Sequence, residues 1–556
     1  MMSSVDALVA ACLVPLAVAA VVSGLDDLVL DVAMAWRWLQ RRLSPITEIV
    51  ERAARPAMPA VSPAGVDAPE KRIAVFLPLW QEEAVVGRML THNIGALRYS
   101  AYDFFVGVYA NDPGTMEAVR EAESRFPNVH MAIVPHDGPT SKADCLNWIF
   151  QGMLAHEEAC GVRFEIVVTH DAEDVIHPDG LSWINYHSAN YDMIQIPVLP
   201  LPTPFHRLTH GTYCDEFAEY QTKDVPVRAA LGGFLPSNGV GTGYTRRALD
   251  RLADSGRNRV FDPTCLTEDY DCGLRLHRLG FRQIFVPIRF SAAGLVATRE
   301  YFPQRFRQAV RQRTRWVTGI CLQGWERHGW RGGPAAVYWF WRDRKGLLGN
   351  PLSLFGNLIT LYGLLSWAWC AYSGQPWGLK GAALGTVPRM LLVGALASQV
   401  LRTAVRTGCS ARLYGFAFAA GVPLRTIWAN WMNALATITA IFRYTRARLL
   451  REPQVWLKTA HTYPALSSRD PAPALSYQVL DARLIRREVA RALPRHVVRQ
   501  WKVLPFKVAE GQLFLATPEL PRVALRDDLK RFTRLEVRFQ LITEENYEAL
   551  VKVILS

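Results

Sequence analysis

The chain has 556 residues, 50% of them hydrophobic, which is enough for two or three domains with large cores. Its formal charge of +13 indicates an anionic partner such as acidic lipid or a nucleotide-activated substrate, whereas no helix-turn-helix, zinc-finger or RNA-binding motif is present to indicate nucleic acid. The nine cysteines are scattered without a CxxC pair, which argues against a zinc site and a disulfide framework.

The N-terminal region contains an apolar run, Ala7–Gly24, that predicts a membrane span. Positive charge follows this run from Arg37 to Arg42, whereas a cleaved signal peptide carries its positive charge before the apolar run. We therefore expect residues 1–45 to hold an uncleaved transmembrane segment whose arginines lie in the cytoplasm. Residues 46–70 are rich in Ala and Pro and predict a linker.

Short β-type runs alternate with helical segments from residue 71 onwards. This alternation predicts a parallel, doubly wound sheet, in which ligands bind beyond the carboxyl ends of the strands. The polar residues that follow each strand are therefore candidates for a site. The four runs that predict buried strands are Ile73–Pro78, Phe104–Tyr109, Val129–Val134 and Phe164–Thr169.

Charged residues follow the first three predicted strands. Glu82 comes after the first strand, and Asp112 lies in a tight turn after the second. Lys142 opens a helix after the third strand, and a lysine at the start of a helix can meet a phosphate group. Ordinary turn chemistry is the alternative for each of these residues taken singly.

Three carboxylates, Asp171, Glu173 and Asp174, follow the fourth predicted strand within four residues. Without a cation they would repel one another. Oxygen ligands suit Mg²⁺ or Mn²⁺, which usually shares its shell with substrate phosphates. A solvated acidic turn is the alternative.

Two further stretches carry candidate residues. Thr267-Glu268-Asp269 precedes a helix, where an acidic pair either complements the helix dipole or places a general base in a cleft. Gln312, Arg315 and Trp316 lie in a basic, aromatic run that starts at Tyr301. This run predicts a helix at a membrane surface, or alternatively the wall of a site that faces an anionic substrate.

Together these segments resemble a membrane-integrated family 2 glycosyltransferase, the group that includes cellulose, hyaluronan and poly-N-acetylglucosamine synthases. Six motifs in the family's order, over about residues 70–445, carry the resemblance. His170–Pro178 and Thr267–Gly280 are in addition similar to the bacteriophage N4 adsorption protein B type of glycosyltransferase. The six motifs are Pro78–Glu83, Asp112, Lys142–Asn147, Asp171–Glu173 in place of a DxD, Thr267–Asp269 as the TED motif, and Gln312–Trp316 as QxxRW.

The resemblance implies an α/β GT-A (Rossmann-like) domain inserted between transmembrane helices. It also implies inverting, processive transfer from a UDP-sugar to a growing polysaccharide, which is exported through the chain's own transmembrane region. The family's second DxD aspartate is Glu173 here, so whether Glu173 or the adjoining Asp174 binds metal stays open. The implied roles are catalysis by Asp269 with Glu268 and Thr267, donor binding by Glu82, Asp112, Lys142 and Asp171, Mg²⁺ or Mn²⁺ binding by Asp171 and Glu173, and acceptor or diphosphate binding by Gln312, Arg315 and Trp316.

The apolar segments beyond residue 300 complete the expected membrane part. We expect the GT-A domain over 71–300, interfacial helices over 301–345 and transmembrane or re-entrant helices over 346–445. Within the last range, the predicted spans are Leu347–Tyr372 and Gly381–Leu401, the second interrupted by Arg389, and Leu413–Phe442 is broken at Gly421-Val422-Pro423 and favours an interfacial helix over a re-entrant pair.

Residues 446–474 predict a second linker, and residues 475–556 predict a small α/β module. The module resembles part of the N-terminal domain of type II secretion ATPases, of which some members bind cyclic di-GMP. The Arg- and Gly-containing first half of the binders is not recognisable in the sequence, so a plain interaction module is the alternative.

The resemblance places the chain in the bacterial inner membrane, with the catalytic and C-terminal domains in the cytoplasm. The expected partners are a UDP-sugar, a polysaccharide acceptor, membrane lipid and an outer-membrane export partner, with no nucleic acid. Two other functions stay open: a synthase that makes a lipid-linked sugar by a single transfer, and a non-catalytic membrane receptor or scaffold.

Overall fold

The computed structural model separates into two compact units, residues 1–288 with 297–464 and residues 289–296 with 465–556. It describes residues 4–43, 69–256, 258–291, 294–381, 385–452 and 463, and in the second unit residues 480, 485, 487–509, 512–518, 529, 532–533, 535–542 and 544–554. Most of the linker predicted over 46–70 lies outside the described residues.

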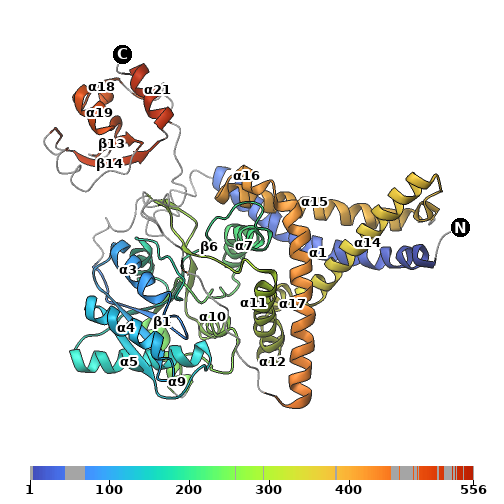
Figure 1. Ribbon diagram of the computed structural model, residues 1–556, viewed down its shortest axis with the longest axis horizontal. Coiled ribbons are helices and arrows are strands. Elements are labelled where there is room, and N and C mark those ends of the chain that lie inside the picture. Colours follow the sequence, from blue (N-terminus) through green and yellow to red (C-terminus); the bar gives the residue numbers. More distant parts are fainter. Residues whose placement is uncertain are drawn as a thin grey trace. The chain divides into compact units, whose positions relative to one another are not determined.

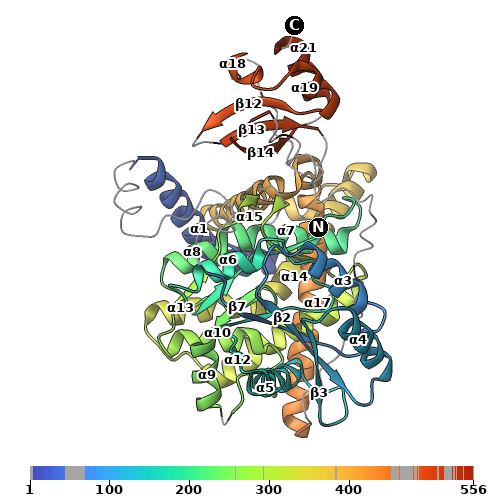
Figure 2. The ribbon, with the colours of Figure 1, turned by 90° about the vertical axis from the view of Figure 1, so that its left-hand side faces the viewer.

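A seven-stranded mixed sheet forms the centre of the first unit (Figures 1 and 2). Its order is β3-β2-β1-β4-β7-β5-β8. The four predicted strands are confirmed, and they pair with one another in parallel as expected. The full sheet is mixed, because β7 runs antiparallel to β4 and β5. The strands are β1 (Ile73–Pro78), β2 (Tyr102–Tyr109), β3 (Val129–Val134), β4 (Ile166–Thr169), β5 (Met193–Gln195), β7 (Thr242–Thr245) and β8 (Gln283–Phe285).

The register of the parallel strands brings their carboxyl ends together. Pro78 of β1 pairs with Gly107 of β2, and Phe76 of β1 pairs with Thr169 of β4. The acidic turn after β4 therefore lies beside the segment that follows β1. A separate parallel pair, β6 (Val198–Pro200) with β11 (Thr298–Glu300), adds a later strand end.

Helices accompany the sheet, and local sequence explains where α4 and α5 begin and where α5 ends. Helix α5 starts after Ser141, whose side chain accepts a hydrogen bond from Asp144 N, and it ends at Gly161 in the left-handed conformation that favours glycine. Helix α4 starts with Pro113 after the N-cap Asp112. The helices are α3 (Val86–Ala96), α4 (Pro113–Arg125), α5 (Lys142–Cys160), α6 (Gly180–His187), α9 (Arg246–Ser255) and α10 (Glu268–Arg278).

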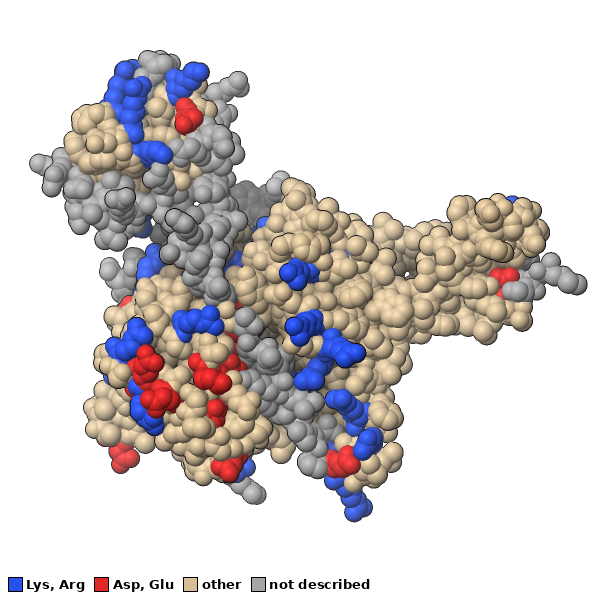
Figure 3. Space-filling model, in the orientation of Figure 1, with Lys and Arg blue, Asp and Glu red and all other residues tan. Residues whose placement is uncertain are grey.

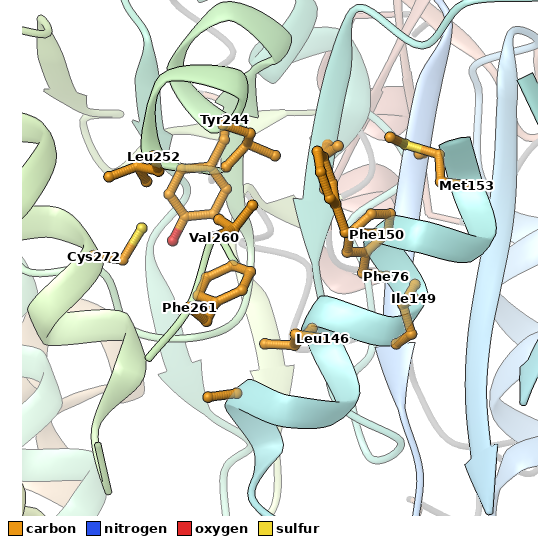
Figure 4. Close-up of a cluster of buried hydrophobic side chains, with 14 of the residues drawn as sticks. Phe76, Leu146, Ile149, Phe150, Met153, Tyr244, Leu252, Val260, Phe261 and Cys272 are labelled. Atoms are coloured by element: carbon orange, nitrogen blue, oxygen red, sulfur yellow. The ribbon is translucent and has the colours of Figure 1, made fainter. Parts of the chain in front are cut away.

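The core between sheet and helices is apolar and aromatic (Figure 4). Phe76 of β1 and Phe150 of α5 are almost fully buried, and so are Tyr244 of β7 and Cys272 of α10. Burying such side chains is the main driving force for folding, at about 25 cal/mol per Å² of apolar surface. This core fixes α5 and α10, which carry Lys142 and Asp269.

A second set of helices comes from residues 208–230, between β6 and β7, and from residues 306–344, after β11. Two short π-helices, η2 and η3, interrupt α-helical runs, and the sequence pattern does not predict them. Such segments occur often at functional sites. The set consists of α7 (Leu208–Glu219), η2 (Tyr220–Asp224), α8 (Val225–Ala230), α11 (Phe306–Trp316), η3 (Val317–Gln323), α12 (Gly324–His328) and α13 (Pro334–Arg344).

Helices α1, α14 and α15 extend together away from the sheet (Figure 1), and their described surface is almost without charged side chains on the face shown in Figure 3. Within the described residues, two helical stretches, 4–40 and 334–373, are long and apolar enough to cross a membrane. The span expected over Gly381–Leu401 does not meet that criterion, although α15 is one helix there. The helices are α1 (Ser4–Leu43), α14 (Gly346–Ser373), the 3₁₀-helix η4 (Gly378–Gly381), α15 (Thr386–Tyr414), α16 (Phe416–Ala419) and α17 (Val422–Leu450).

The break predicted near Gly421 is confirmed, because α17 begins at Val422 with Pro423 in its first turn. The linker predicted from residue 446 is wrong in its first residues, since α17 continues to Leu450. The rest of that linker, apart from Tyr463, lies outside the described residues.

A layer of ion pairs joins α1 to the helices around it. Asp26 of α1 contacts Arg342 and Lys345 at 2.7 Å each, and Asp31 contacts Lys223 of η2 at 2.9 Å. The aspartates that follow the apolar part of α1 are thus paired within the protein.

The second unit contains a three-stranded sheet of order β12-β13-β14, in which β12 and β13 are antiparallel and β13 and β14 parallel. Leu513 and Leu515 of β13 pack in its core with Val498 and Leu550 of the helices. The expected small α/β module is confirmed. Its elements are α18 (Arg487–Ala490), α19 (Arg495–Trp501), β12 (Leu504–Ala509), β13 (Gln512–Thr517), β14 (Glu536–Leu541) and α21 (Glu544–Ile554), and the short strands β9 (Phe290–Ser291) and β10 (Gly294–Leu295) belong to the same unit.

Candidate active site

A cavity of about 560 Å³ opens where the carboxyl ends of β1 and β4 meet α10 and α11. Nearly all the candidate residues line this cavity, although they come from segments up to 234 residues apart in the sequence. They are Glu82, Lys142, Asp171, Glu173, Thr267, Glu268, Asp269, Gln312, Arg315 and Trp316.

Lys142, at the start of α5, is the cation nearest to the acidic turn. Its Nζ lies 2.5 Å from Oδ1 of Asp171 and 3.4 Å from the carbonyl oxygen of Gly239. Burial alone would lower the pKa of Lys142, but the negative charges of Asp171 and Glu268 outweigh burial and raise it. Lys142 is therefore charged at neutral pH.

Glu268 and Asp269 stand at the N-terminus of α10, and Thr267 is the residue before it. Oδ1 of Asp269 accepts a hydrogen bond from Tyr270 N at 2.8 Å. Burial, together with the charge of Asp269, raises the pKa of Glu268 to about 7. Burial also raises the pKa of Asp269, against the lowering effect of Lys142. A raised pKa suits a carboxylate that accepts a proton near neutral pH.

The glycine-containing loop at Asn238-Gly239 approaches this acidic pair closely. Gly239 has a φ of +77°, and a Cβ on it would lie 2.8 Å from Oδ2 of Asp269. Glycine is needed at this position because the backbone has a positive φ and because there is no room for a Cβ beside Asp269. Asn238 lines the cavity as well.

In the acidic turn after β4, two carboxylates line the cavity and the third is bound within the turn. Oδ2 of Asp174 lies 2.7 Å from Nδ1 of His170 and accepts a hydrogen bond from Asp171 N at 3.0 Å, and Asp174 does not line the cavity. Asp171 and Glu173 do line it. The structure therefore places Glu173, and not Asp174, where a ligand of the cavity would meet it.

Glu300, at the end of β11, joins these carboxylates, and sequence reasoning missed it because no motif surrounds it. Burial raises the pKa of Glu300 well above its usual value, and the charges of Asp174, Glu173 and Asp171 raise it further. Negative charge is thus concentrated at this end of the cavity. A bound cation would relieve the repulsion.

The residues present fit a divalent cation that is only partly held by protein. Asp171, Glu173 and Glu300 offer oxygen atoms alone, which suits Mg²⁺ or Mn²⁺. Among the described residues, however, no three His, Cys, Asp or Glu side chains are grouped closely enough to hold an ion by themselves. Phosphate oxygens of a substrate would have to complete the shell.

One face of the QxxRW helix α11 lines the cavity, and the other contacts α7 and α17. Gln312, Arg315 and Trp316 line the cavity, and within the described part of the chain Oε1 of Gln312 and Nε of Arg315 are buried without a hydrogen-bond partner. Arg313 points the other way and contacts Glu216 of α7 at 2.7 Å and Asn433 of α17 at 2.5 Å. Helices α7 and α17 thus cover this face of α11 at Arg313.

Asp112, like Asp174, is a candidate that does not line the cavity. Oδ1 of Asp112 accepts a hydrogen bond from Thr115 N at 3.4 Å, and Oδ2 accepts one from Gln81 N at 2.5 Å. Gln81 has a φ of +54°, a conformation that this contact helps to hold. The structure shows Asp112 as a capping residue, while the aromatic rings of Trp80 and Tyr109 line that end of the cavity.

Comparison with known proteins identifies two matched regions of the chain. Residues 69–319 match the family described as "Glycosyltransferase like family 2", and residues 474–552 match the MshEN domain. The chain is 36% identical over 475 residues to bacteriophage adsorption protein B of Escherichia coli K12 and, to the same extent, to bacteriophage N4 adsorption protein B of Escherichia coli O157:H7. The match covers 82% of this chain and 62% of each relative, so the chain spans less than two thirds of their length.

Two solved structures are similar at lower identity. The mannosyltransferase PcManGT from Pyrobaculum calidifontis, in complex with GDP-Man and Mn²⁺, is 18% identical with a TM-score of 0.41 over 75% of this chain and 99% of that one. Residues 1–349 of S. aureus TarS are 11% identical with a TM-score of 0.30 over 61% of this chain and 91% of that one.

The expected fold class is confirmed by the family match and by the mixed sheet that carries the motifs. The matched range 69–319 contains the sheet and α11. The chain therefore contains a family 2 glycosyltransferase domain with a GT-A-like fold, followed by an MshEN domain, and it is related over 82% of its length to bacteriophage N4 adsorption protein B.

Proposed function

We propose that this chain is an inverting glycosyltransferase that transfers a sugar from a nucleoside diphosphate sugar, first of all a UDP-sugar, to a growing polysaccharide. One observation supports this most strongly. The Lys142–Asp171 pair and the acidic pair Glu268–Asp269 share one cavity with Arg315 and Trp316. One substrate could therefore reach a cation, carboxylates of the type that bind metal, a candidate base and an aromatic ring.

The diphosphate of the donor would bind between Lys142 and Arg315, whose buried Nε has no hydrogen-bond partner among the described residues. Asp171 and Glu173 would hold a Mg²⁺ or Mn²⁺ ion, which when bound neutralises the charge of the diphosphate leaving group. The rings of Trp80 and Tyr109 offer apolar surface for the nucleobase at the other end of the cavity.

Asp269 would accept the proton of the acceptor hydroxyl while that oxygen attacks the anomeric carbon. The new C–O bond forms as the bond to the diphosphate breaks, and a single displacement of this kind inverts the anomeric centre. General-base assistance contributes about 10² to 10⁴ in rate. Trp316 lies on the same wall and provides a ring on which the acceptor sugar can stack.

The test is a nucleotide-release assay with the full-length protein in detergent, over a panel of UDP- and GDP-sugars with Mg²⁺ or Mn²⁺. Asp269→Asn should keep donor binding and lose at least about 10² in turnover. Asp254→Asn, at an exposed position, is the matched control and should behave as wild type. Near wild-type turnover in Asp269→Asn would show that the base is misassigned. No release from any donor by the wild type would overturn the proposed activity.

Processivity and export are further parts of the proposal, and the two long apolar helices support a location in the inner membrane. Membranes supplied with labelled donor should form a ladder of polymer that passes to an export partner. A single lipid-soluble labelled product would instead identify a synthase of a lipid-linked sugar.

Cyclic di-GMP is the regulatory ligand that we propose for the MshEN domain. The family match over residues 474–552 supports this proposal. Titration of the purified protein with cyclic di-GMP should change the rate of nucleotide release. An unchanged rate, with no binding by calorimetry, would leave the domain as an interaction module.

A further inference from the structure

Asp343 connects the proposed base helix to the segment that enters α14. It lies in the last turn of α13, three residues before α14 begins. Its Oδ2 accepts a hydrogen bond from the Tyr270 hydroxyl at 2.7 Å. Tyr270 directly follows Asp269, and its main-chain N–H donates to Oδ1 of Asp269 at 2.8 Å. Two hydrogen bonds through one residue thus join Asp343 to the proposed base.

Arg228 of α8 holds the same carboxylate from the other side. Its guanidinium donates two hydrogen bonds to Asp343, at 2.7 and 3.0 Å, which is the bidentate geometry that fixes a carboxylate in orientation. Its Nε donates to the carbonyl oxygen of Phe234 at 2.7 Å. Phe234 begins the loop that leads to Gly239, so one arginine anchors both Asp343 and the loop that lies against Asp269.

Apolar packing surrounds these polar contacts. Tyr270 is 5% exposed and Arg228 is 4% exposed. The Arg228 guanidinium lies 4.1 Å from the centre of the Phe234 ring and 5.1 Å from that of Trp339. Leu30 of α1 belongs to the same buried cluster. Because the groups are buried, each hydrogen bond is expensive to leave unmade.

Resting on the proposed function, we infer that Asp343 is a positioning residue, which acts through Tyr270 to set the carboxylate of Asp269 relative to the helices of the membrane part. Asp343 needs no contact with the reacting atoms for this role. A shift of about 1 Å in a catalytic group can cost about 10²-fold in rate, so a small displacement of Tyr270 is enough to be measured. The connection also gives α13 and α14 a direct mechanical route to the active site.

The first test is Tyr270→Phe, which removes the hydroxyl and keeps the ring. We expect kcat for nucleotide release to fall about tenfold, while the donor KM stays within a factor of two of wild type. Tyr99→Phe is the matched control, because the Tyr99 hydroxyl is also buried and donates to Lys71 O at 2.6 Å, away from the cavity. That control should keep full kcat.

The second test is a cycle with Asp343→Asn and the double variant. If Asp343 acts through Tyr270, the double variant is no slower than Asp343→Asn alone. Unchanged kcat in Tyr270→Phe with a lowered melting temperature would show a purely structural role and overturn the inference, and so would effects of the two changes that multiply. Failure of the proposed function is distinguishable, because wild-type protein run in parallel would then release no nucleotide either.

Discussion

Nζ of Lys142 lies 2.5 Å from Oδ1 of Asp171, so the start of α5 and the turn after β4 meet at the wall of the cavity. The pair joins the two motifs that a nucleotide sugar has to meet at its diphosphate. It also compensates a strongly acidic region, because Glu268 and Asp269 both act on the pKa of Lys142. Several expectations rest on this arrangement.

Lys142→Met should lower nucleotide release by at least about 10², because the diphosphate loses a desolvated charge partner and the carboxylates lose their cation. Lys142→Arg should recover part of the rate. Lys71→Met is the control, since Lys71 donates to Ser188 Oγ at 2.9 Å and does not line the cavity. Steady-state kinetics over donor concentration provide the measurement, and equal rates for Lys142→Met and the control would contradict the role.

Trp316→Ala should impair use of the acceptor more than binding of the donor, because the ring lines the cavity and is the surface proposed for stacking of the acceptor sugar. The ring also packs against Tyr213 and Phe302, with centroids 6.1 and 6.4 Å away. Trp316→Phe keeps an aromatic face and is therefore the matched control. The measurement compares donor affinity with transfer to an added oligosaccharide. Equal loss of both in Trp316→Ala would indicate disturbed packing alone.

Local sequence was sufficient for the strands and for most of the site. Buried runs such as Ile73–Pro78 carry their own signal, and parallel strands bring the residues that follow them to one edge. The family match over 69–319 is in line with these motifs. Local sequence does not show which residues from distant parts of the chain contact the site. Glu300 and Asp343 stand in unremarkable stretches and reach the cavity only through the tertiary fold.

The amphipathic pattern alone also leaves the surroundings of α11 undetermined at Arg313. A basic, aromatic helix next to apolar segments predicts contact with lipid, yet Arg313 is 6% exposed and paired with Glu216. A charged residue is buried when an opposite charge from another helix meets it, and spacing within one helix cannot show this. Asp112 is the opposite case. The motif predicted that it binds the donor, but the sequence did not show that its carboxylate accepts capping hydrogen bonds from Thr115 N and Gln81 N.

Glu268→Gln should change how stability depends on pH. Burial and the charge of Asp269 raise the pKa of Glu268 from 4.5 to about 7, so the folded state holds this proton more tightly than the unfolded state. The stability that the group contributes is fully present below pH 4.5 and is lost as the pH rises through about 7. Glutamine has no such loss. Between pH 5 and 8 the free energy of unfolding of the variant should therefore rise relative to that of wild type, by at most about 3 kcal/mol. Thermal melts across this pH range, in detergent, are the measurement, and parallel curves for the two proteins would contradict the prediction.

Asp215→Asn should destabilise the contact between α7 and the helices α15 to α17. Arg425 is 1% exposed, and its Nε and a terminal nitrogen lie 2.6 and 3.0 Å from the Asp215 carboxylate. Breaking such a buried pair leaves an uncompensated charge and costs about 3–5 kcal/mol. Replacing both partners, as Asp215→Leu with Arg425→Met, should be less damaging than Asp215→Leu alone, because no buried charge remains. Unfolding followed by circular dichroism in detergent measures the effect. If the single and double variants lose the same stability, packing volume, and not the unpaired guanidinium, sets the cost at this site.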